Sequence, residues 1–597
     1  MGPNVAKRGS AAIALTLFAL CGVYCGPVTG RSFAEGSVRA VSGDAQRGPA
    51  GPVIRVERVA AGRWRVTYRL GEPTPALVFD RPAGFYRERA WSVVTPGYAF
   101  ARRDDRQVLE VSPGRDAAAE IVIELGEFRE QLPREYELFV GFADGGVALY
   151  TGHLYARPDG VGGPERPSIR TLEIVPPAGT RAVLRGGVHD GPFEWPDGVG
   201  DGTYVHFGST EPAETDDMIA VLDGELPGWL RSQFESWLPR LFAIYSERLE
   251  VELPWKPVVL YGFEDVDRPG LSWGGGTLTG LIQLTVSGTE WREPTAEGER
   301  SALGFLAHEA AHLWNGQLVR SAGGRSPWMH EGSADALAGH LLEELGLIDA
   351  DGLRERYERA LNTCLQLTGT VSPNAAADPR VPYECGQLMA LWTLAALRRS
   401  GSETDLFGFW SALIEGALRN PPASPGEARG EYDEALYLAT LADFGVERDA
   451  RERFRAFLAE AEGDRTEMAL AGLGAEGLAL EPTETAPEVY RVELARRAMT
   501  HLMSAACDGR YSFDSGSAFR TYAIPDCDPF AEPLEVHRIA GFRVDTEGDA
   551  LYDRVAERCA AGDAIALEDA GDAVIAEAPC ARRLEPRRPW LRLASLP

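Results

Sequence analysis

An HEAAH segment that runs from His308 to His312, followed after 18 residues by Glu331, constrains this chain more than any other feature. Residues four apart lie on the same face of an α-helix, so the two imidazoles can point at one site. Two imidazoles and a carboxylate are the usual protein ligands of a catalytic zinc ion, and they leave its fourth position for water. Glu309 lies beside the first ligand and can act on that water as general base. The segment therefore predicts one Zn2+ ion bound by His308, His312 and Glu331. The alternative is a pair of histidines satisfied inside a core helix.

The composition limits the classes of partner. The chain has 597 residues, of which 44% are hydrophobic and 25% are charged, so it is long enough for several globular domains. Its formal net charge of −29 opposes binding to nucleic acid or to an anionic membrane surface. No segment beyond the N-terminus is apolar enough to predict a transmembrane helix in the mature chain. The sequence favours no particular oligomeric state.

The N-terminus is typical of an export signal. Basic Lys7 and Arg8 precede an apolar stretch from Ala11 to Val23, and small residues follow it. We therefore expect residues 1–34 to be a signal peptide, and the mature chain to be periplasmic or extracellular. The cysteines of this segment would allow a lipid anchor, which we do not favour because a bulky residue precedes each of them.

The mature chain would keep an even number of cysteines, which suggests disulfides in an exported protein. None of them has CxxC spacing, so a cysteine-based metal site is not expected. They are Cys364, Cys385, Cys507, Cys527, Cys559 and Cys580.

Alternating apolar and polar residues predict strands over the first part of the mature chain. The segments are 53–59, 64–70, 120–125 and 136–142. Their spacing and turn residues favour an antiparallel sandwich over residues 50–160.

The next part of the chain mixes strands and helices. Helical periodicity covers 227–249, and short strands are expected at 257–261 and 280–286. A helix from about residue 297 carries the HEAAH segment and should end at Gly316.

Ser326-Pro327 is a favourable start for the helix that holds Glu331. Five further helices are expected at 351–366, 384–399, 404–417, 430–443 and 447–461. Beyond residue 490 the pattern favours short strands with one helix, at 549–560.

The HEAAH segment and the distant Glu331 resemble the signature of the gluzincin metallopeptidases, above all the aminopeptidase-N-like and glycyl aminopeptidase families. Three further segments carry the likeness. HLWN at 312–315 is similar to the HxWN of the glycyl aminopeptidases, and WMHEG at 328–332 resembles the segment around the third ligand in both families. VPYECG at 381–386 is close to the YEKG segment of the aminopeptidase-N-like family, although a cysteine replaces its lysine.

The resemblance implies roles for single residues. Zinc held by the two histidines and Glu331 would polarise the scissile carbonyl, and Glu309 would activate the water. Tyr383 would stabilise the oxyanion. Asp335, one helical turn after Glu331, would hold a ligand histidine by its other nitrogen.

One departure affects substrate recognition. Aminopeptidases of this clan carry a Gly-x-Met-Glu-Asn segment, whose glutamate binds the α-amine of the substrate. GLI at 280–282 aligns with the family's G-L-I, so Thr277 falls near the missing glutamate. Gly275, Gly276 and Thr277 are still predicted to bind substrate, because an extended peptide can add to a glycine-rich strand edge. Aminopeptidase specificity is therefore uncertain.

The C-terminal region is similar to the second half of a PDZ domain, over 536–568. Its four cysteines suggest two disulfides within this module, and Cys364 with Cys385 would form a third that closes the loop positioning Tyr383.

We therefore expect a multidomain α+β protein. The N-terminal β-sandwich precedes a thermolysin-like α/β and helical catalytic domain over 168–400, a helical domain over 401–485 and a disulfide-containing PDZ-like β domain over 490–597. The favoured function is an exported zinc metallopeptidase that cleaves peptide or protein substrates. The alternatives are a catalytically silent, metal-containing module that binds peptides or proteins, and a zinc hydrolase of a non-peptide bond.

Overall fold

The computed structural model describes residues 39–40, 52–82, 86–103, 106–127, 135–159, 170–197, 202–264, 272–324, 326–376, 378–421, 428–459, 461, 463–483, 487–524, 526–580 and 582–597. The predicted signal peptide lies outside these ranges. The chain divides into two compact units. Among the described residues, the larger unit comprises those before Arg354 and those from Pro382 to Ala459, and the smaller comprises those from Arg354 to Val381 and those after Ala459. Sheets and helices occur in both, which confirms the multidomain α+β class. None of the described helices is long and apolar enough to cross a bilayer.

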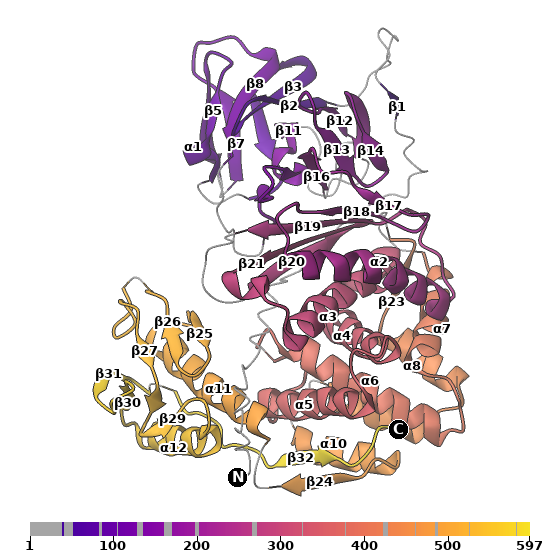
Figure 1. The fold of residues 1–597 in the computed structure, drawn as a ribbon, viewed down its shortest axis with the longest axis vertical. Helices are drawn as coiled ribbons and strands as arrows, with labels where there is room; N and C mark the ends of the chain where they lie inside the picture. The colour runs from indigo at the N-terminus through magenta and orange to yellow at the C-terminus, as the bar shows by residue number, and fades with distance from the viewer. Residues whose placement is uncertain are drawn as a thin grey trace, which may run out of the picture. The chain divides into compact units, whose positions relative to one another are not determined.

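Three sheets build the N-terminal part of the larger unit, coloured indigo to magenta in Figure 1. Their strand orders are β1-β15-β12-β2-β3-β8-β5, β11-β4-β7-β6 and β14-β13-β16-β10-β9. The elements are β1 (Arg39–Ala40), β2 (Val53–Ala60), β3 (Arg63–Thr74), β4 (Ala76–Phe79), α1 (Tyr86–Ala90), β5 (Trp91–Val93), β6 (Tyr98–Arg103), β7 (Arg106–Val111), β8 (Ala118–Gly126), β9 (Phe139–Gly141), β10 (Val147–Tyr150), β11 (Ala156–Pro158), β12 (Arg170–Val175), β13 (Arg181–Leu184), β14 (Gly187–His189), β15 (Phe193–Asp197) and β16 (Tyr204–Gly208).

Period-two alternation forms these strands. Ile54 and Val56 of β2 and Trp64, Val66 and Tyr68 of β3 are all buried in one core, so every second side chain faces inward. The strands predicted from this alternation near the start of the chain are present.

One expectation for this region is corrected: the strand predicted at 136–142 is only the three residues of β9. The strands described between residues 52 and 159 pair antiparallel with one another, as predicted. β2 also pairs in parallel with β12, which lies beyond that range. Strands that pair across more than 100 residues of chain are set by tertiary packing, which local alternation does not report.

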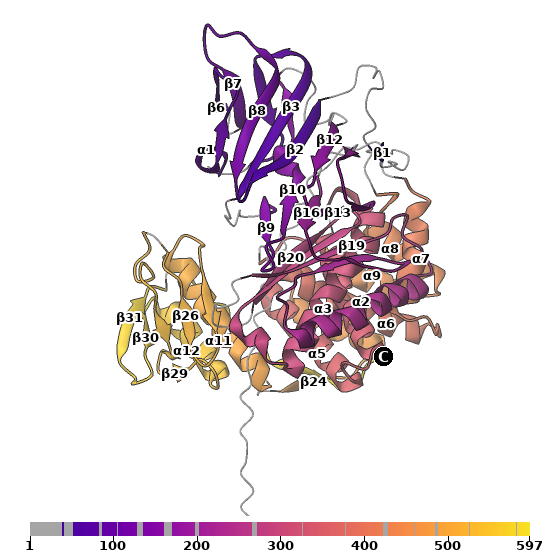
Figure 2. The same ribbon diagram turned by 45° about the horizontal axis from the view of Figure 1, so that its top comes forward.

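A five-stranded sheet of order β17-β18-β19-β21-β20 carries the candidate site. Its strands are β17 (Ala213–Glu214), β18 (Ile219–Leu222), β19 (Val258–Glu264), β20 (Ser272–Leu278) and β21 (Leu281–Ser287). β18, β19 and β21 run parallel and are nearly continuous apolar runs, as expected of strands covered on both faces. One face packs against residues of β9, β10, β13 and β16, while Figure 2 shows α2 (Gly228–Leu249) and α3 (Ala296–His312) on the other side. β20 pairs antiparallel with β21 and is an edge strand.

Helices complete the larger unit. They are α4 (Pro327–Glu344), α6 (Val381–Arg399), α7 (Leu406–Leu418), α8 (Glu434–Asp443) and α9 (Arg448–Leu458), with the short elements η2 (Thr289–Arg292), η3 (Leu313–Leu318), β22 (Val319–Ser321), η4 (Ala322–Gly324) and β23 (Gly430–Tyr432). The helix predicted over 430–443 instead starts at Glu434, because residues 430–432 pair with β22 as β23. The HEAAH helix does not end at Gly316: regular α-helix stops at His312 and η3 continues it as a π-helical turn.

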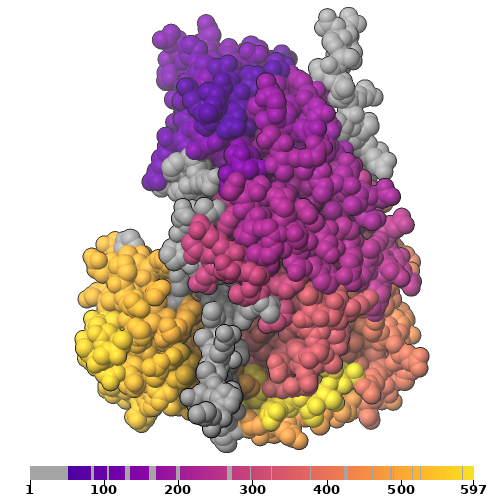
Figure 3. All heavy atoms as spheres, viewed as in Figure 1, coloured from indigo at the N-terminus to yellow at the C-terminus, as the bar shows by residue number. Residues whose placement is uncertain are grey.

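The smaller unit has its own core. Its elements are α5 (Ala350–Thr368), α10 (Arg465–Ala475), β24 (Leu480–Thr483), α11 (Glu488–Ala506), β25 (Phe513–Ser515), β26 (Phe519–Thr521), β27 (Glu535–Val536), β28 (Arg538–Ile539), β29 (Phe542–Arg543), α12 (Gly548–Ala561), β30 (Ile565–Glu568), β31 (Val574–Ala578) and β32 (Trp590–Leu593). The expectation of one helix beyond residue 490 was wrong, since α11 precedes α12. Leu494, Ala498 and Leu502 of α11 are buried at helical spacing in the core that α12 shares. The space-filling view shows a lobe of orange to yellow residues at the lower left (Figure 3).

Two disulfides link elements of this C-terminal module, as its four cysteines suggested. One joins Cys507, at the end of α11, to Cys527, and the other joins Cys559 of α12 to Cys580. The PDZ-like character of the module stays a prediction.

Candidate metal centre

Helix α3 brings the two histidines of the HEAAH segment together. Thr295 caps its first turn by accepting a hydrogen bond from the Gly298 amide, and the helix runs without interruption to His312. His308 and His312 are one turn apart, both are buried, and their Nε2 atoms are 3.1 Å apart. The two imidazoles therefore converge on one point in the interior.

Glu331 of α4 supplies the third candidate ligand atom, a carboxylate oxygen. Its Oε2 lies 3.4 Å from the Nε2 atom of His308 and 3.4 Å from that of His312. Four ligands about 2.05 Å from a zinc ion in tetrahedral array have neighbouring ligand atoms about 3.3 Å apart. The three donor atoms thus have the spacing of three corners of such a tetrahedron.

The chemistry of the donors fits a bound cation as well. Glu331 Oε2 is buried and has no hydrogen-bond partner, which would be costly for a carboxylate oxygen with nothing to neutralise it. Burial opposes the charged form of His308, yet Asp335, Glu331 and Glu309 together raise its pKa well above the usual value. Burial likewise favours neutral Glu331, but the neighbouring histidines hold its pKa well below the usual value. These residues fit a zinc ion.

Hydrogen bonds on the far nitrogens set the orientation of both rings. His308 Nδ1 lies 2.9 Å from Asp335 Oδ1, and His312 Nδ1 lies 3.0 Å from Asn315 Oδ1. Because carboxylate and amide oxygens only accept, each Nδ1 donates, and the lone pair of each Nε2 faces the centre. Gln387 supports Asp335 through its amide, 3.2 Å from Oδ2.

Asn315 was not assigned a role from the sequence, although it lies in the HLWN segment. The π-helical turn after His312 places it: its Nδ2 donates to the His330 carbonyl at 2.9 Å, and its own carbonyl accepts from Tyr432 Oη at 2.5 Å. A single π-turn inside a helix is often a feature of functional sites. The one indication in the sequence was that Asn315 lies three residues after His312, close enough on a helix for the two side chains to meet.

His330 packs against the ligand histidine His312. Its ring stacks on that of His312 with centroids 4.0 Å apart. Gly316 allows the approach, because a Cβ there would lie 2.5 Å from His330 Cε1. The glycine expected to end the helix therefore serves packing instead.

Helix α6 brings Tyr383 to the same site. Its ring stacks against that of His308 with centroids 5.9 Å apart. Glycines allow the approach, since a Cβ on Gly332 would lie 2.2 Å from the Gly386 Cα atom. The glycine after Glu331 and the glycine after the YEC segment thus meet where α4 and α6 cross.

The edge strand β20 runs beside Glu309. Gly275 has φ of +155° and no room for a side chain, because a Cβ would lie 2.1 Å from the Gln283 carbonyl oxygen. The next residue, Gly276, pairs with Gln283. The hydroxyl of Thr277 lies 2.7 Å from Glu309 Oε2 and 3.0 Å from the Glu309 carbonyl oxygen. The residue in the place of the family's amine-binding glutamate therefore contacts the expected general base.

None of the protein-family models matches this chain. Among solved structures, an aminopeptidase N family protein of Idiomarina loihiensis superposes with a TM-score of 0.56 and 13% sequence identity, over 92% of this chain and 98% of that chain. The two proteins share a fold. This confirms, for the fold, the resemblance to the aminopeptidase-N-like family that the motifs indicated.

Two further relatives carry aminopeptidase names. Aminopeptidase A of Legionella pneumophila, solved with aspartic acid, has a TM-score of 0.41 and 12% identity over 69% of this chain and 49% of that chain. Leucine aminopeptidase 2 of Lodderomyces elongisporus is 32% identical over 111 residues. That stretch is 18% of this chain and spans only 15% of the relative's length.

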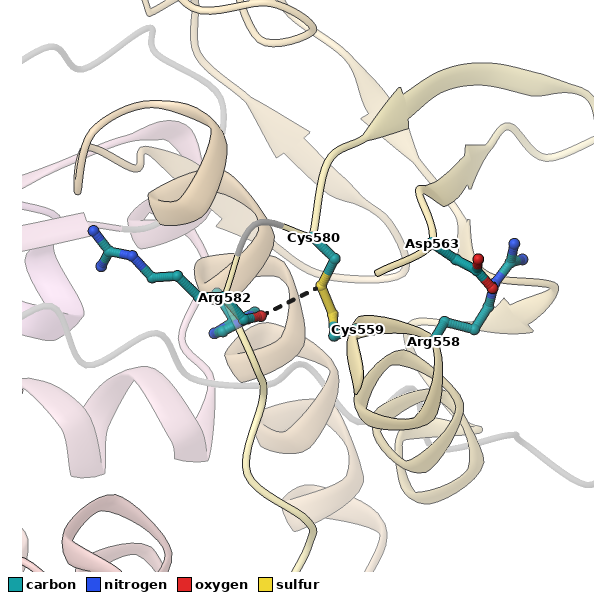
Figure 4. Close-up of a disulfide and its surroundings, with 6 residues drawn as sticks. Arg558, Cys559, Asp563, Cys580 and Arg582 are labelled. Atoms are coloured by element: carbon teal, nitrogen blue, oxygen red, sulfur yellow. Dashed lines mark hydrogen bonds and ion pairs between the residues drawn. A yellow bond between two sulfur atoms is a disulfide. The ribbon is translucent and has the colours of Figure 1, made fainter. Parts of the chain in front are cut away.

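A second group of metal-ligating residue types occurs in the described part of the chain. His501, Cys559 and Cys580 have candidate donor atoms within 4.8 Å of one another. Figure 4 shows that the two cysteines are joined as a disulfide, with the Arg582 carbonyl 3.7 Å from Cys580 Sγ. A disulfide has no thiolate to offer a metal, so this group does not fit one.

Proposed function

We propose that the chain is an exported zinc metallopeptidase with an aminopeptidase N fold. The observation that carries the proposal is the triangle of His308 Nε2, His312 Nε2 and Glu331 Oε2, with edges of 3.1 and 3.4 Å and with both rings oriented from behind. A structural zinc site needs four protein ligands, whereas three suit a catalytic site. The stretch shared with a leucine aminopeptidase supports peptide hydrolysis, and the disulfides of the C-terminal module support export.

Glu309 and Tyr383 would each have a separate role in the reaction. A zinc ion bound there would polarise the scissile carbonyl and make water more acidic. Glu309, adjacent to the first ligand and 1% exposed, would accept the proton of the attacking water and pass it to the leaving amine. Tyr383, stacked beside His308, would donate a hydrogen bond to the oxyanion.

Substrate would bind along β20, the outermost strand of its sheet. An extended peptide can add to an edge strand, and glycine at Gly275 and Gly276 lets its backbone approach closely. The edge runs past Glu309, so a peptide bound there would place a carbonyl near the catalytic carboxylate.

The decisive experiment compares the zinc-loaded protein with its Glu309→Gln variant on a peptide mixture, read by mass spectrometry. We expect cleavage by the wild type and a loss of at least about 100-fold in the variant, with unchanged zinc content. Glu299→Gln, on the first turn of the same helix, is the matched control and should keep activity. Equal cleavage by wild type and Glu309→Gln would refute the mechanism. Zinc binding without cleavage of any peptide would favour the silent binding module, and turnover of esters or epoxides alone would favour the non-peptide hydrolase.

A further inference from the structure

The hydroxyl of Thr277 is buried against Glu309. Thr277 is 5% exposed and Glu309 is 1% exposed, although β20 and α3 are 32 residues apart in the chain at this contact. The distance of 2.7 Å from Oγ1 to Oε2 is that of a charge-assisted hydrogen bond, which is stronger than a neutral one. Because a hydroxyl has one proton, the nearer carboxylate oxygen takes most of it, and the Glu309 carbonyl at 3.0 Å takes a lesser share.

Thr277 is itself held on its main chain. Tyr136 Oη donates to the Thr277 carbonyl at 3.3 Å, and the Tyr136 ring packs against Tyr150 and Tyr204 with centroids 4.8 and 6.2 Å away. The residue also pairs with Ile282 in the β20–β21 ladder. The hydrogen bond from Tyr136 and the strand pairing therefore fix the main chain of Thr277, and this holds its hydroxyl against Glu309.

A fixed donor matters for a general base. Proton transfer requires the accepting oxygen within hydrogen-bond reach of the water, and a carboxylate that rotates about its last bond spends less time there. A hydroxyl that holds Oε2 restricts this rotation and keeps the carboxylate in one orientation.

We propose that Thr277 is a positioning residue for Glu309 rather than a binding residue for the α-amine of the substrate. The inference rests on the proposed peptidase function. A neutral hydroxyl carries no negative charge to attract an α-ammonium group, and the one proton of this hydroxyl is donated to Glu309. The three carboxylates around the imidazoles already have other contacts. Glu309 accepts from Thr277, Glu331 lies 3.4 Å from both ligand histidines, and Asp335 accepts from His308.

The test is a pair of substitutions at one position. Thr277→Val removes the hydroxyl at nearly constant shape, and Thr277→Ser keeps it. We expect Thr277→Val to lower kcat by about 10- to 100-fold with KM changed less than about threefold, because geometry is lost while substrate contacts remain. Thr277→Ser should restore most of kcat. Thr285→Val, which removes a hydroxyl from the neighbouring strand β21, is the matched control.

Two readouts separate positioning from other roles. The loss in Thr277→Val should be the same on peptides with free and with acetylated N-termini, whereas an amine-binding role would raise KM only on free N-termini. Zinc content and competition with a chelator should equal those of the wild type, which a general disruption of the site would not give.

Clear outcomes overturn the proposal. Unchanged kcat in Thr277→Val, a loss confined to free N-termini, or no recovery in a folded Thr277→Ser would each contradict it. If Thr277→Val does not fold, Thr277→Ala takes its place against Thr277→Ser. If the wild type and Glu309→Gln both lack peptidase activity, the proposed function itself fails, which is distinct from a wild-type peptidase that is indifferent to Thr277.

Discussion

Two groups of metal-ligating side chains come together in the described residues, and they differ in what surrounds them. In the larger unit, His308, His312 and Glu331 direct donor atoms at one point, and hydrogen bonds from the Nδ1 atoms of the rings to Asp335 and Asn315 fix the rings. In the smaller unit, the sulfurs of Cys559 and Cys580 are bonded to each other. The nearby His501 has its Nε2 atom 2.9 Å from the Arg582 carbonyl, so that nitrogen carries the proton.

The difference shows that residue types within reach of one another do not define a metal centre. A ligand must be deprotonated at the atom that faces the metal. The first group needs only to release protons to meet this condition, whereas the second would need its disulfide to be reduced. The second group closes a loop of 21 residues, which is a contribution to stability.

The largest expected effect separates the two groups by zinc binding. The wild type should hold one zinc per chain, and His312→Ala should lower the affinity by at least about 100-fold, because one of three protein ligands is lost. His501→Ala is the matched control and should retain one zinc. Elemental analysis together with chelator competition measures both. Loss of zinc in His501→Ala, with zinc retained in His312→Ala, would show that the metal binds at the second group.

The helix crossing at the first group tolerates no added methyl. Gly332→Ala should lower the free energy of unfolding of the larger unit by at least about 3 kcal/mol, since its Cβ would lie 2.2 Å from the Gly386 Cα atom. Gly474→Ala in helix α10, where a Cβ meets nothing within 4 Å, should change stability by less than about 1 kcal/mol. Denaturant unfolding followed by circular dichroism gives both values. Equal stability of the two variants would show that α4 and α6 are not in contact there.

The disulfide of the second group should affect stability without affecting zinc. Replacing Cys559 and Cys580 together by serine should cost the smaller unit about 3 kcal/mol, by the entropy of an opened loop. Zinc content and activity should remain those of the wild type. Unfolding with and without a reductant measures the first effect, and a fall in zinc content of the oxidised double variant would contradict the assignment.

The smallest expected effect on zinc affinity concerns the side chains that accept hydrogen bonds from the Nδ1 atoms of the two ligand histidines. Asp335→Ala and Asn315→Ala should each weaken zinc binding by about 10- to 100-fold, because each releases one ring from its fixed orientation. Asn420→Ala, which removes a side-chain amide that donates to the Gly416 carbonyl at 3.2 Å, should leave the affinity unchanged. Chelator competition at constant pH orders the three variants. An Asn315→Ala variant with wild-type affinity would restrict the support to His308.

Local patterns predicted the parts of the fold that local physics controls. The alternation in β2 and β3 and the HEAAH helix were predicted because a repeating spacing reports which face of an element is buried. Helix α11 was not predicted, although Leu494, Ala498 and Leu502 have helical spacing; its apolar face is covered by tertiary packing, above all on α12. The start of β23 was missed because its partner, β22, lies more than 100 residues earlier.

The sequence by itself indicated the three candidate metal ligands and the proposed general base, since two histidines four apart beside a glutamate admit few other uses. Only the tertiary structure decided how they are held. It placed Asn315 behind His312 through a π-turn, brought Gly332 against Gly386 and set Thr277 on the carboxylate of Glu309. These contacts join segments separated along the chain or depend on an irregular turn, and neither leaves a periodic trace in the sequence.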